Sequence, residues 1–224
     1  MSEKTHYLSG LGIDIWQAQQ GVSQTKPEMA EADATVVWQA LKQQVSDCQA
    51  CPLHATRTQT VFGVGHQQAD LLVVGEAPGY YEDQQGEPFV GPAGQLLNAE
   101  LKAIGLSRDS VYIANVLKCR PPENRDPNPD EISRCTQHLN QQIDLLRPKV
   151  ILALGRYAAH YLLGCQESMA RLRGRCHHYG EQAIPLIVSY HPAYLLRAPK
   201  EKAKAWQDLQ LVQATLEKQA CDQH

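Results

Sequence analysis

The sequence predicts an α/β fold in which a mostly parallel sheet, flanked by helices, is the middle layer of a three-layer sandwich. Short apolar runs of four or five residues, typical of buried strands, alternate with longer segments of helical periodicity. Polar motifs follow several of these runs, where sites form at the carboxyl ends of parallel strands. With 224 residues, 43% of them hydrophobic, the chain fits one globular domain with appendages.

The N-terminal residues 1–27 are predicted to be a flexible tail, and residues 28–224 to form the domain. The tail holds a short apolar island at 7–16, followed by a Gln/Ser/Thr-rich linker at 17–27. The first helix of the domain is expected to run from near residue 27 to about residue 46. Val37, Leu41 and Val45 recur on one of its faces.

Beyond that helix, strands and helices are expected to alternate. The predicted strands are 71–74, 111–114, 150–154 and 186–189. The predicted helices are 91–104, 129–146, 155–163 and 200–218. A proline in the first turn and acidic residues beside it mark the start of the helix at 129–146.

Charge is distributed unevenly along the chain, although the net charge is only −3. Residues 1–110 hold 6 Lys and Arg against 13 Asp and Glu, a balance of −7, whereas residues 147–204 hold 10 against 3, a balance of +7. This asymmetry predicts a basic face on a weakly acidic body, although a solvated surface without a partner fits equally well. No apolar run has membrane-spanning length, the N-terminus lacks the features of a signal peptide, and seven cysteines cannot form a complete disulfide framework. A cytoplasmic, reducing location is therefore expected.

Four cysteines have a spacing that suits a metal centre. Cys48 and Cys51 form a C-x2-C pair, and Cys119 and Cys135 follow at a distance. Four thiolates brought together by a fold can hold an iron–sulfur cluster or a structural zinc ion. Zinc sites more often use two C-x2-C pairs, and the simplest alternative is four buried thiols without metal. The remaining cysteines, Cys165, Cys176 and Cys221, are interpreted as ordinary thiols.

Three motifs follow predicted strands. Gly75-Glu-Ala-Pro-Gly79 is a turn whose glycines let the backbone approach a ligand, and its Glu76 would project into a cleft. Asn115 ends the second strand, and His191 follows the fourth. Each also has a plainer interpretation: an exposed acid in a tight turn, an asparagine closing a strand, and a His-Pro turn before a helix.

Together these features resemble the family 4 uracil-DNA glycosylases, which carry a [4Fe-4S] cluster. The resemblance rests on the four cysteines and on the segments Gly75–Gly79, Asn115-Val-Leu-Lys-Cys-Arg-Pro-Pro122 and His191-Pro-Ala-Tyr-Leu-Leu-Arg197, and it spans about residues 40–215. It implies the fold of these glycosylases and a uracil-DNA glycosylase activity that hydrolyses the N-glycosidic bond of flipped deoxyuridine to start base excision repair. It also implies a structural [4Fe-4S] cluster on Cys48, Cys51, Cys119 and Cys135.

The resemblance assigns roles to individual residues. The base would stack on Phe89, hydrogen-bond to Asn115 and contact Gly75 and Ala77. The catalytic residues would be Glu76, which orients water or stabilises the cationic sugar, His191, which donates to uracil O2, and Asn124. The DNA contacts would be Arg125, Tyr194, Leu195, Leu196 and Arg197. One of Tyr80 and Tyr81 is expected to exclude the methyl group of thymine. The segment 123–128 lacks the histidine of the family's covalent branch, which argues for turnover.

The tail has a separate resemblance. Leu8, Leu11, Ile13 and Trp16 resemble the N-terminal peptide of the DNA polymerase III psi subunit, which docks on the chi subunit. The tail is thus expected to bind chi or another replisome protein, or else to fold back on its own domain. Two other functions stay open for the chain: a non-catalytic replisome accessory on a glycosylase fold, and a zinc-stapled nucleotide-binding protein. The intact Glu76, Asn115 and His191 argue against the accessory.

Overall fold

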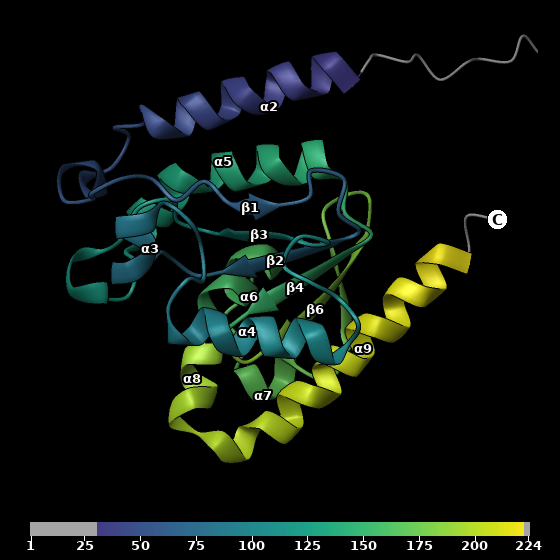
Figure 1. Ribbon diagram of the computed structural model, residues 1–224. Coiled ribbons are helices and arrows are strands. Elements are labelled where there is room, and N and C mark those ends of the chain that lie inside the picture. The colour runs from purple at the N-terminus through teal and green to yellow at the C-terminus, as the bar shows by residue number, and fades with distance from the viewer. Residues whose placement is uncertain (1–30, 222–224) are drawn as a thin grey trace, which may run out of the picture. The chain divides into compact units, whose positions relative to one another are not determined.

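The computed structural model describes residues 31–221 (Figure 1). The chain divides into two compact units, Met1–Val37 and Trp38–His224, and the second unit contains the sheet and all the sites described below. Helix α2, Glu31–Ser46, begins in the first unit and ends in the second. The predicted docking peptide at 7–16 lies outside the described residues.

The second unit is built on a six-stranded sheet with the order β1-β3-β2-β4-β6-β5. The strands are β1 Val64–Gly65, β2 Leu71–Gly75, β3 Tyr112–Asn115, β4 Val150–Leu154, β5 Cys176–Tyr179 and β6 Ile184–Ser189. The four central strands are parallel to one another, and the two edge strands β1 and β5 are antiparallel to their neighbours. The four predicted strands are these central four, so the prediction of a mostly parallel sheet is confirmed.

Helices cover both faces of this sheet. Successive side chains of a strand point to opposite faces, and every residue of β2 and β4 is buried, so both faces must be covered. On one face, Leu71 and Val73 of β2 pack against α4, Pro92–Ala103, and α9, Lys202–Cys221. On the other face, Leu72 and Val74 pack against α5, Pro129–Leu146, α6, Arg156–Leu163, and the part of α2 from residue 38 onward. Figure 1 shows α4 and α9 on one side of the strands and α5 on the opposite side. The predicted three layers are therefore present.

The structure adds short elements that periodicity did not predict. They are the helices α3 Tyr80–Gln85, α7 Met169–Leu172 and α8 Pro192–Arg197, and the 3-10 turns η1 Pro52–Ala55, η2 Pro122–Asn124 and η3 Pro199–Glu201. Each spans six residues or fewer, too short for a helical repeat of apolar positions to be visible in the sequence. Within residues 31–221, no helix combines the length and apolar character that crossing a membrane requires.

The carboxyl ends of the parallel strands bring the sequence motifs together. Gly75 at the end of β2 pairs in register with Asn115 at the end of β3. On the other side of the sheet centre, Leu154 at the end of β4 pairs with Ser189, two residues before His191. Three motifs separated by up to 116 positions in the chain therefore meet at one edge of the sheet, as predicted.

Candidate active site

A cavity of about 470 Å³ opens at this edge. Nine of the predicted site residues line it: Glu76, Ala77, Phe89, Asn115, Asn124, Arg125, His191, Tyr194 and Arg197. The other lining residues are Pro78, Gly79, Glu82, Ala93, Pro121 and Ala193. The sequence therefore predicted most of the residues that line the cavity, and the nine predicted residues come from five separate segments of the chain.

Asn115 supplies an unused polar atom to this cavity. Its side chain is only 2% exposed, and its Oδ1 has no hydrogen-bond partner. Because a buried acceptor without a donor is costly, such an atom is suited to a ligand that brings an N–H group. Gly75 does not line the cavity but makes room for it. A Cβ at Gly75 would lie 2.3 Å from Asn115 Oδ1 and 2.6 Å from Phe89 Cζ.

The backbone of Phe89 is held in a left-handed conformation, with φ of 56°. The carboxylate of Glu82 accepts hydrogen bonds from Val90 N (3.1 Å) and Gly91 N (3.2 Å), and also from Gly79 N (3.1 Å). On the other side, the Arg108 guanidinium donates to Phe89 O and to Pro88 O. These contacts hold a conformation that a bulky residue rarely adopts, which indicates a functional constraint on the ring.

His191 stacks against that ring, with 5.4 Å between ring centroids and 26° between planes. It is the N-cap of α8, and its Nδ1 accepts a hydrogen bond from Ala193 N at 3.2 Å. Burial, and then the positive charge of Arg197, lower the pKa of His191 to about 4. The ring is therefore neutral near pH 7. Since Nδ1 accepts, the single proton is on Nε2, which remains available as a donor.

Glu76 is the half-buried carboxyl group of the cavity. Burial and the neighbouring charge of Asp126 raise its pKa to about 7, while Arg156 lowers it. Asp126 and Arg156 form an exposed ion pair of 3.5 Å. Near neutral pH Glu76 is thus poised between its acid and its carboxylate, as is common for a general base.

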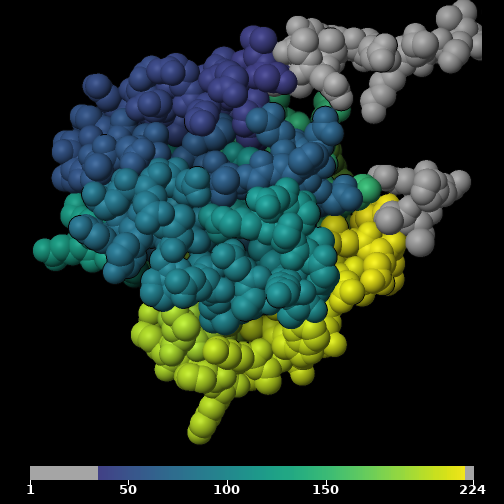
Figure 2. Space-filling view, in the orientation of Figure 1, coloured from purple at the N-terminus to yellow at the C-terminus, as the bar shows by residue number. Residues whose placement is uncertain are grey.

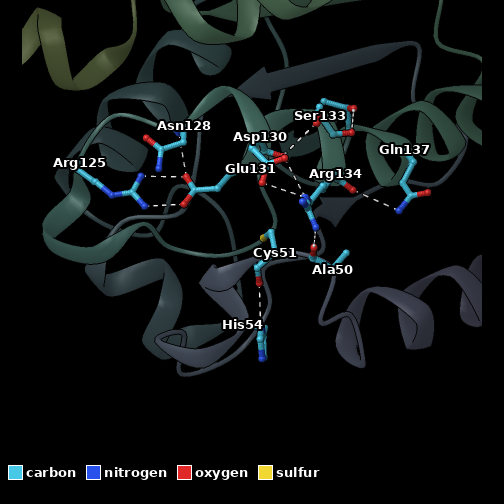
Figure 3. A network of polar contacts seen from close by, with 11 residues as sticks. Ala50, Cys51, His54, Arg125, Asn128, Asp130, Glu131, Ser133, Arg134 and Gln137 are labelled. Atoms are coloured by element: carbon cyan, nitrogen blue, oxygen red, sulfur yellow. Dashed lines mark hydrogen bonds and ion pairs between the residues drawn. The ribbon is translucent and has the colours of Figure 1, made fainter.

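The loop that follows Pro121 also contributes to the cavity, and its conformation was not predicted. Asn124 has a φ of 54°, and its Oδ1 accepts a hydrogen bond from Arg120 Nε at 2.8 Å. Arg125 donates through both terminal nitrogens to the carboxylate of Glu131, at 2.9 and 2.6 Å (Figure 3). The Arg125 guanidinium therefore anchors its loop to α5, and a contact of Arg125 with DNA stays a prediction.

Helix α8 corrects one predicted DNA contact. Tyr194 and Leu196 are exposed, at 39% and 44%, but Leu195 between them is fully buried. Residues 192–197 form a helix. As a helix it turns successive side chains by about 100°, so one of three neighbours faces the core. The prediction for Leu195 is therefore wrong. Figure 2 shows the yellow-green segment with α8 and η3 as one exposed surface beside α4.

Neither tyrosine expected to exclude thymine lines the cavity. Tyr80 and Tyr81 are each 54% exposed. The Tyr80 ring lies beneath the Arg120 guanidinium, 5.1 Å from its centroid, and the Tyr81 ring lies against Gly91. The cavity wall near this turn is made by Pro78 and Glu82 instead.

The four cysteines line a second, enclosed space, together with Val45, Ala50, Arg57, Lys118, Arg134 and His138. Arg57 Nη1 donates to Cys119 Sγ at 3.2 Å, Lys118 N donates to Cys135 Sγ at 3.2 Å, and His138 Nε2 lies 3.4 Å from Cys48 Sγ. Burial raises the pKa of the Cys51 and Cys119 thiols, and that of Cys135 to about 12. Within the described residues, no three or more His, Cys, Asp or Glu side chains lie close enough together, as the structure places them, to hold a metal ion.

Helix α5 connects the two sites through a buried stripe of polar side chains. Glu131, Cys135, His138 and Gln142 follow one another at spacings of four, three and four residues, and each is at most 7% exposed. That spacing places them on one face of a helix. Glu131 holds the cavity loop, while Cys135 and His138 face the cysteine space. Figure 3 shows another tie: Arg134 reaches the carbonyl of Ala50, within the Cys48–Cys51 turn, at 3.0 Å.

Comparison with known proteins gives consistent matches. The profile described as Uracil DNA glycosylase superfamily matches residues 62–210. A type-4 uracil-DNA glycosylase of Archaeoglobus fulgidus is 44% identical over 164 residues, which cover 70% of this chain and 82% of that protein. One of Sulfurisphaera tokodaii is 45% identical over 166 residues, covering 71% and 76%. A more distant match is a DNA polymerase of Bacillus phage SP01, 30% identical over 157 residues, covering 69% of this chain and 17% of the polymerase.

Proposed function

Because this chain belongs to the type-4 uracil-DNA glycosylases of the uracil-DNA glycosylase superfamily, we propose that it flips deoxyuridine out of DNA and hydrolyses the N-glycosidic bond. The observation that carries the proposal is Asn115 Oδ1, buried without a partner beside Phe89 and His191. Uracil N3–H satisfies this acceptor. Cytosine N3 is itself an acceptor, so its binding would leave two acceptors facing each other and the buried amide oxygen unpaired, which disfavours cytosine.

The barrier to this reaction is the departure of uracil as an anion from a sugar that becomes cation-like. Neutral His191, with its proton on Nε2, donates to uracil O2 and stabilises the leaving anion. Phe89 stacks on the base and holds it in position. Glu76 as carboxylate either orients the attacking water or stabilises the cationic sugar, and we assign Asn124 to the same water.

We also propose that Cys48, Cys51, Cys119 and Cys135 hold a structural [4Fe-4S] cluster. The residues fit such a group, because four thiols surround one space and N–H groups of Arg57 and Lys118 point at two of the sulfurs, as they do around cluster ligands. When bound, the cluster supplies cross-links between three distant segments, and no step of the hydrolysis uses it. A purified protein with iron and broad absorbance near 400 nm supports this assignment, whereas zinc alone contradicts it.

DNA would be held by the surface around α8. Tyr194 and Leu196 are exposed there, and Arg197 lines the cavity. We propose that the two exposed side chains fill the gap left by the flipped nucleotide and that Arg197 contacts phosphate.

Incubation of the protein with an oligonucleotide that contains one uracil, followed by alkaline cleavage, tests the proposal directly. We expect cleavage at uracil only, with matched thymine and cytosine oligonucleotides intact. His191→Ala should bind the oligonucleotide and excise slowly under single-turnover conditions. Asn115→Asp should lose roughly 1–3 kcal/mol of base selection. A wild-type protein that leaves uracil in place contradicts the proposed activity.

A second proposal concerns recruitment. Its basis is the sequence of the tail, where apolar residues stand ahead of a Gln-rich linker at 17–27. We propose that Leu8, Leu11, Ile13 and Trp16 dock on the polymerase III chi subunit or another replisome protein. Deleting residues 1–26 should abolish that association and preserve excision on short oligonucleotides. A truncated protein that unfolds or loses excision contradicts a docking role.

A further inference from the structure

A lysine between the two sites is enclosed in the protein interior. The Lys118 side chain is 1% exposed and is among the largest fully buried side chains. Within the described residues, no carboxylate lies within ion-pair distance of it. Lysine is almost never fully buried without a charged partner, because an ammonium group loses much of its hydration there. The burial of Lys118 without a carboxylate partner therefore indicates that other groups stabilise its charge.

The three hydrogens of the Lys118 ammonium have one acceptor each. Nζ donates to Phe62 O at 3.2 Å, to Asn115 O at 2.9 Å and to Gln142 Oε1 at 2.6 Å. The acceptors come from the loop before β1, the end of β3 and the middle of α5. Three acceptors around one nitrogen match the three donors of a charged lysine.

One of these acceptors belongs to the residue that supplies the unpartnered amide oxygen to the cavity. Lys118 Nζ holds the carbonyl of Asn115, and so fixes the backbone from which its side chain projects. Gln142 reinforces the same point, because its Nε2 donates to Phe62 O at 3.0 Å and to Tyr112 Oη at 3.4 Å. The base-reading amide thus rests on a buried polar network with Lys118 at its centre.

The groups that suit the lysine as counter-ions are the neighbouring cysteines. Lys118 lines the same enclosed space as all four of them, and it directly precedes Cys119. Its backbone N–H donates to Cys135 Sγ at 3.2 Å. Cysteines that ligate iron do so as thiolates, and a cluster on four thiolates is an anion, which a buried ammonium group stabilises.

We infer that Lys118 is a positioning residue that links the two sites: it supplies a fully buried positive charge to the four-cysteine centre, beside the guanidinium of Arg57, and holds Asn115 in place for uracil. This inference rests on the proposed function and on the proposed cluster. The Lys118 side chain therefore has two effects that can be measured separately: one on the reduction potential of the four-cysteine centre and one on the recognition of uracil by Asn115.

Two variants separate these effects. Lys118→Met keeps an unbranched side chain, one atom shorter, and removes both its charge and its donors. Gln142→Met leaves the charge beside the cysteines and removes one of the three acceptors. Lys102→Met, an exposed lysine on α4, is the control. The readouts are iron content, the reduction potential of the centre, and kcat and KM for a uracil oligonucleotide.

For Lys118→Met we expect easier loss of iron, a more negative reduction potential and a fall in kcat/KM of about 10-fold to 100-fold, the usual effect of a misplaced group. Gln142→Met should keep the wild-type potential and lose about tenfold in kcat/KM. Lys102→Met should match the wild type in every readout.

The inference is overturned if Lys118→Met folds with an unchanged potential, if Gln142→Met excises uracil like the wild type, or if the wild type assembles no iron–sulfur cluster. Should Lys118→Met fail to fold, Lys118→Gln, which removes the charge and keeps an amide donor, takes its place: an unchanged reduction potential in that variant overturns the inference. A wild type that holds iron but does not excise uracil defeats the proposed function and the base-recognition role of Lys118, and the potential of Lys118→Met still decides its role as a counter-ion.

Discussion

The Phe89 side and the Asn115 side of the cavity are held in different ways. Phe89 is fixed by Glu82 and Arg108, which come from the same stretch of chain, within residues 79–108. Asn115 is fixed by the register of the sheet and by Lys118, whose other contacts reach residues 62 and 142. One side therefore depends on local contacts. The other depends on long-range contacts beside the four-cysteine space, and the two sides should fail under different perturbations.

The largest effect is expected from Cys119→Ala, which should break the Asn115 side first. The variant should lose iron and melt lower by about 10 °C or more, because a structural metal centre contributes directly to folding. Hydrogen exchange should show Val116 N–H and Leu117 N–H, which bond to Gly75 O and Glu76 O, losing protection before Val90 and Gly91 do. Cys176→Ala, at an exposed cysteine, is the control. Near-normal iron content and melting in Cys119→Ala would refute the ligand assignment.

Gly75→Ala should disturb both sides at once. The new Cβ would meet Asn115 Oδ1 and the Phe89 ring, so we expect kcat/KM to fall by about 100-fold and stability by about 1–3 kcal/mol. Gly105→Ala is the matched glycine control. Its φ of 76° makes it destabilising by about 1 kcal/mol, but no atom lies within 4 Å of its Cβ, so excision should persist. Equal activity losses in the two variants would show that Gly75 acts only through stability.

Glu82→Gln should loosen the Phe89 side alone. The carboxylate accepts three backbone N–H groups, and replacing one oxygen by an amide group should cost about 1–3 kcal/mol. We expect kcat/KM to fall about tenfold and hydrogen exchange to speed up at Val90 and Gly91, while iron content stays normal. Glu181→Gln, an exposed acid, should do none of this. A loss of iron in Glu82→Gln would mean that the two sides are not independent.

The smallest effect concerns the pH dependence of excision. Because the pKa of Glu76 is raised to about 7 and its carboxylate is the active form, the single-turnover rate should rise as pH increases through 7 and then level off. His191, with a pKa near 4, stays neutral over that range and should add no second step. In Glu76→Gln the rise should disappear and a low, flat profile remain. A rise of the same size in that variant would assign it to another group.

The sequence predicted the parts of the molecule whose pattern is periodic or whose chemistry follows a strand. Gly75, Asn115 and His191 lie as expected because each follows a buried strand, and parallel strands end at one edge of the sheet. The edge strands were missed because β1 has two residues and β5, Cys-His-His-Tyr, is largely polar. The burial of Leu195 was missed because α8 has only six residues.

The contacts of the buried charged residues Lys118 and Glu131 could not be predicted from the sequence, for a different reason. Lysine and glutamate are exposed in most proteins, so nothing in the local sequence distinguishes Lys118 or Glu131 from surface residues. Their burial depends on partners far along the chain or across a turn: residues 62 and 142 for Lys118, and Arg125 for Glu131. Such pairings become visible only when the fold has brought the segments together.

The polar stripe on α5 has a consequence for how proteins of this kind can diverge. The four polar residues of this stripe can all reach their partners only while the spacing between them along the helix is unchanged. They are Glu131, Cys135, His138 and Gln142. Inserting or deleting one residue between Glu131 and Gln142 would rotate everything downstream by about 100° and turn part of the stripe away from its partners. Substitutions can be accommodated one at a time, but changes of length cannot. In homologous chains, insertions and deletions should therefore lie before Pro129 or after Leu146. The twelve positions from 131 to 142 should keep a constant length.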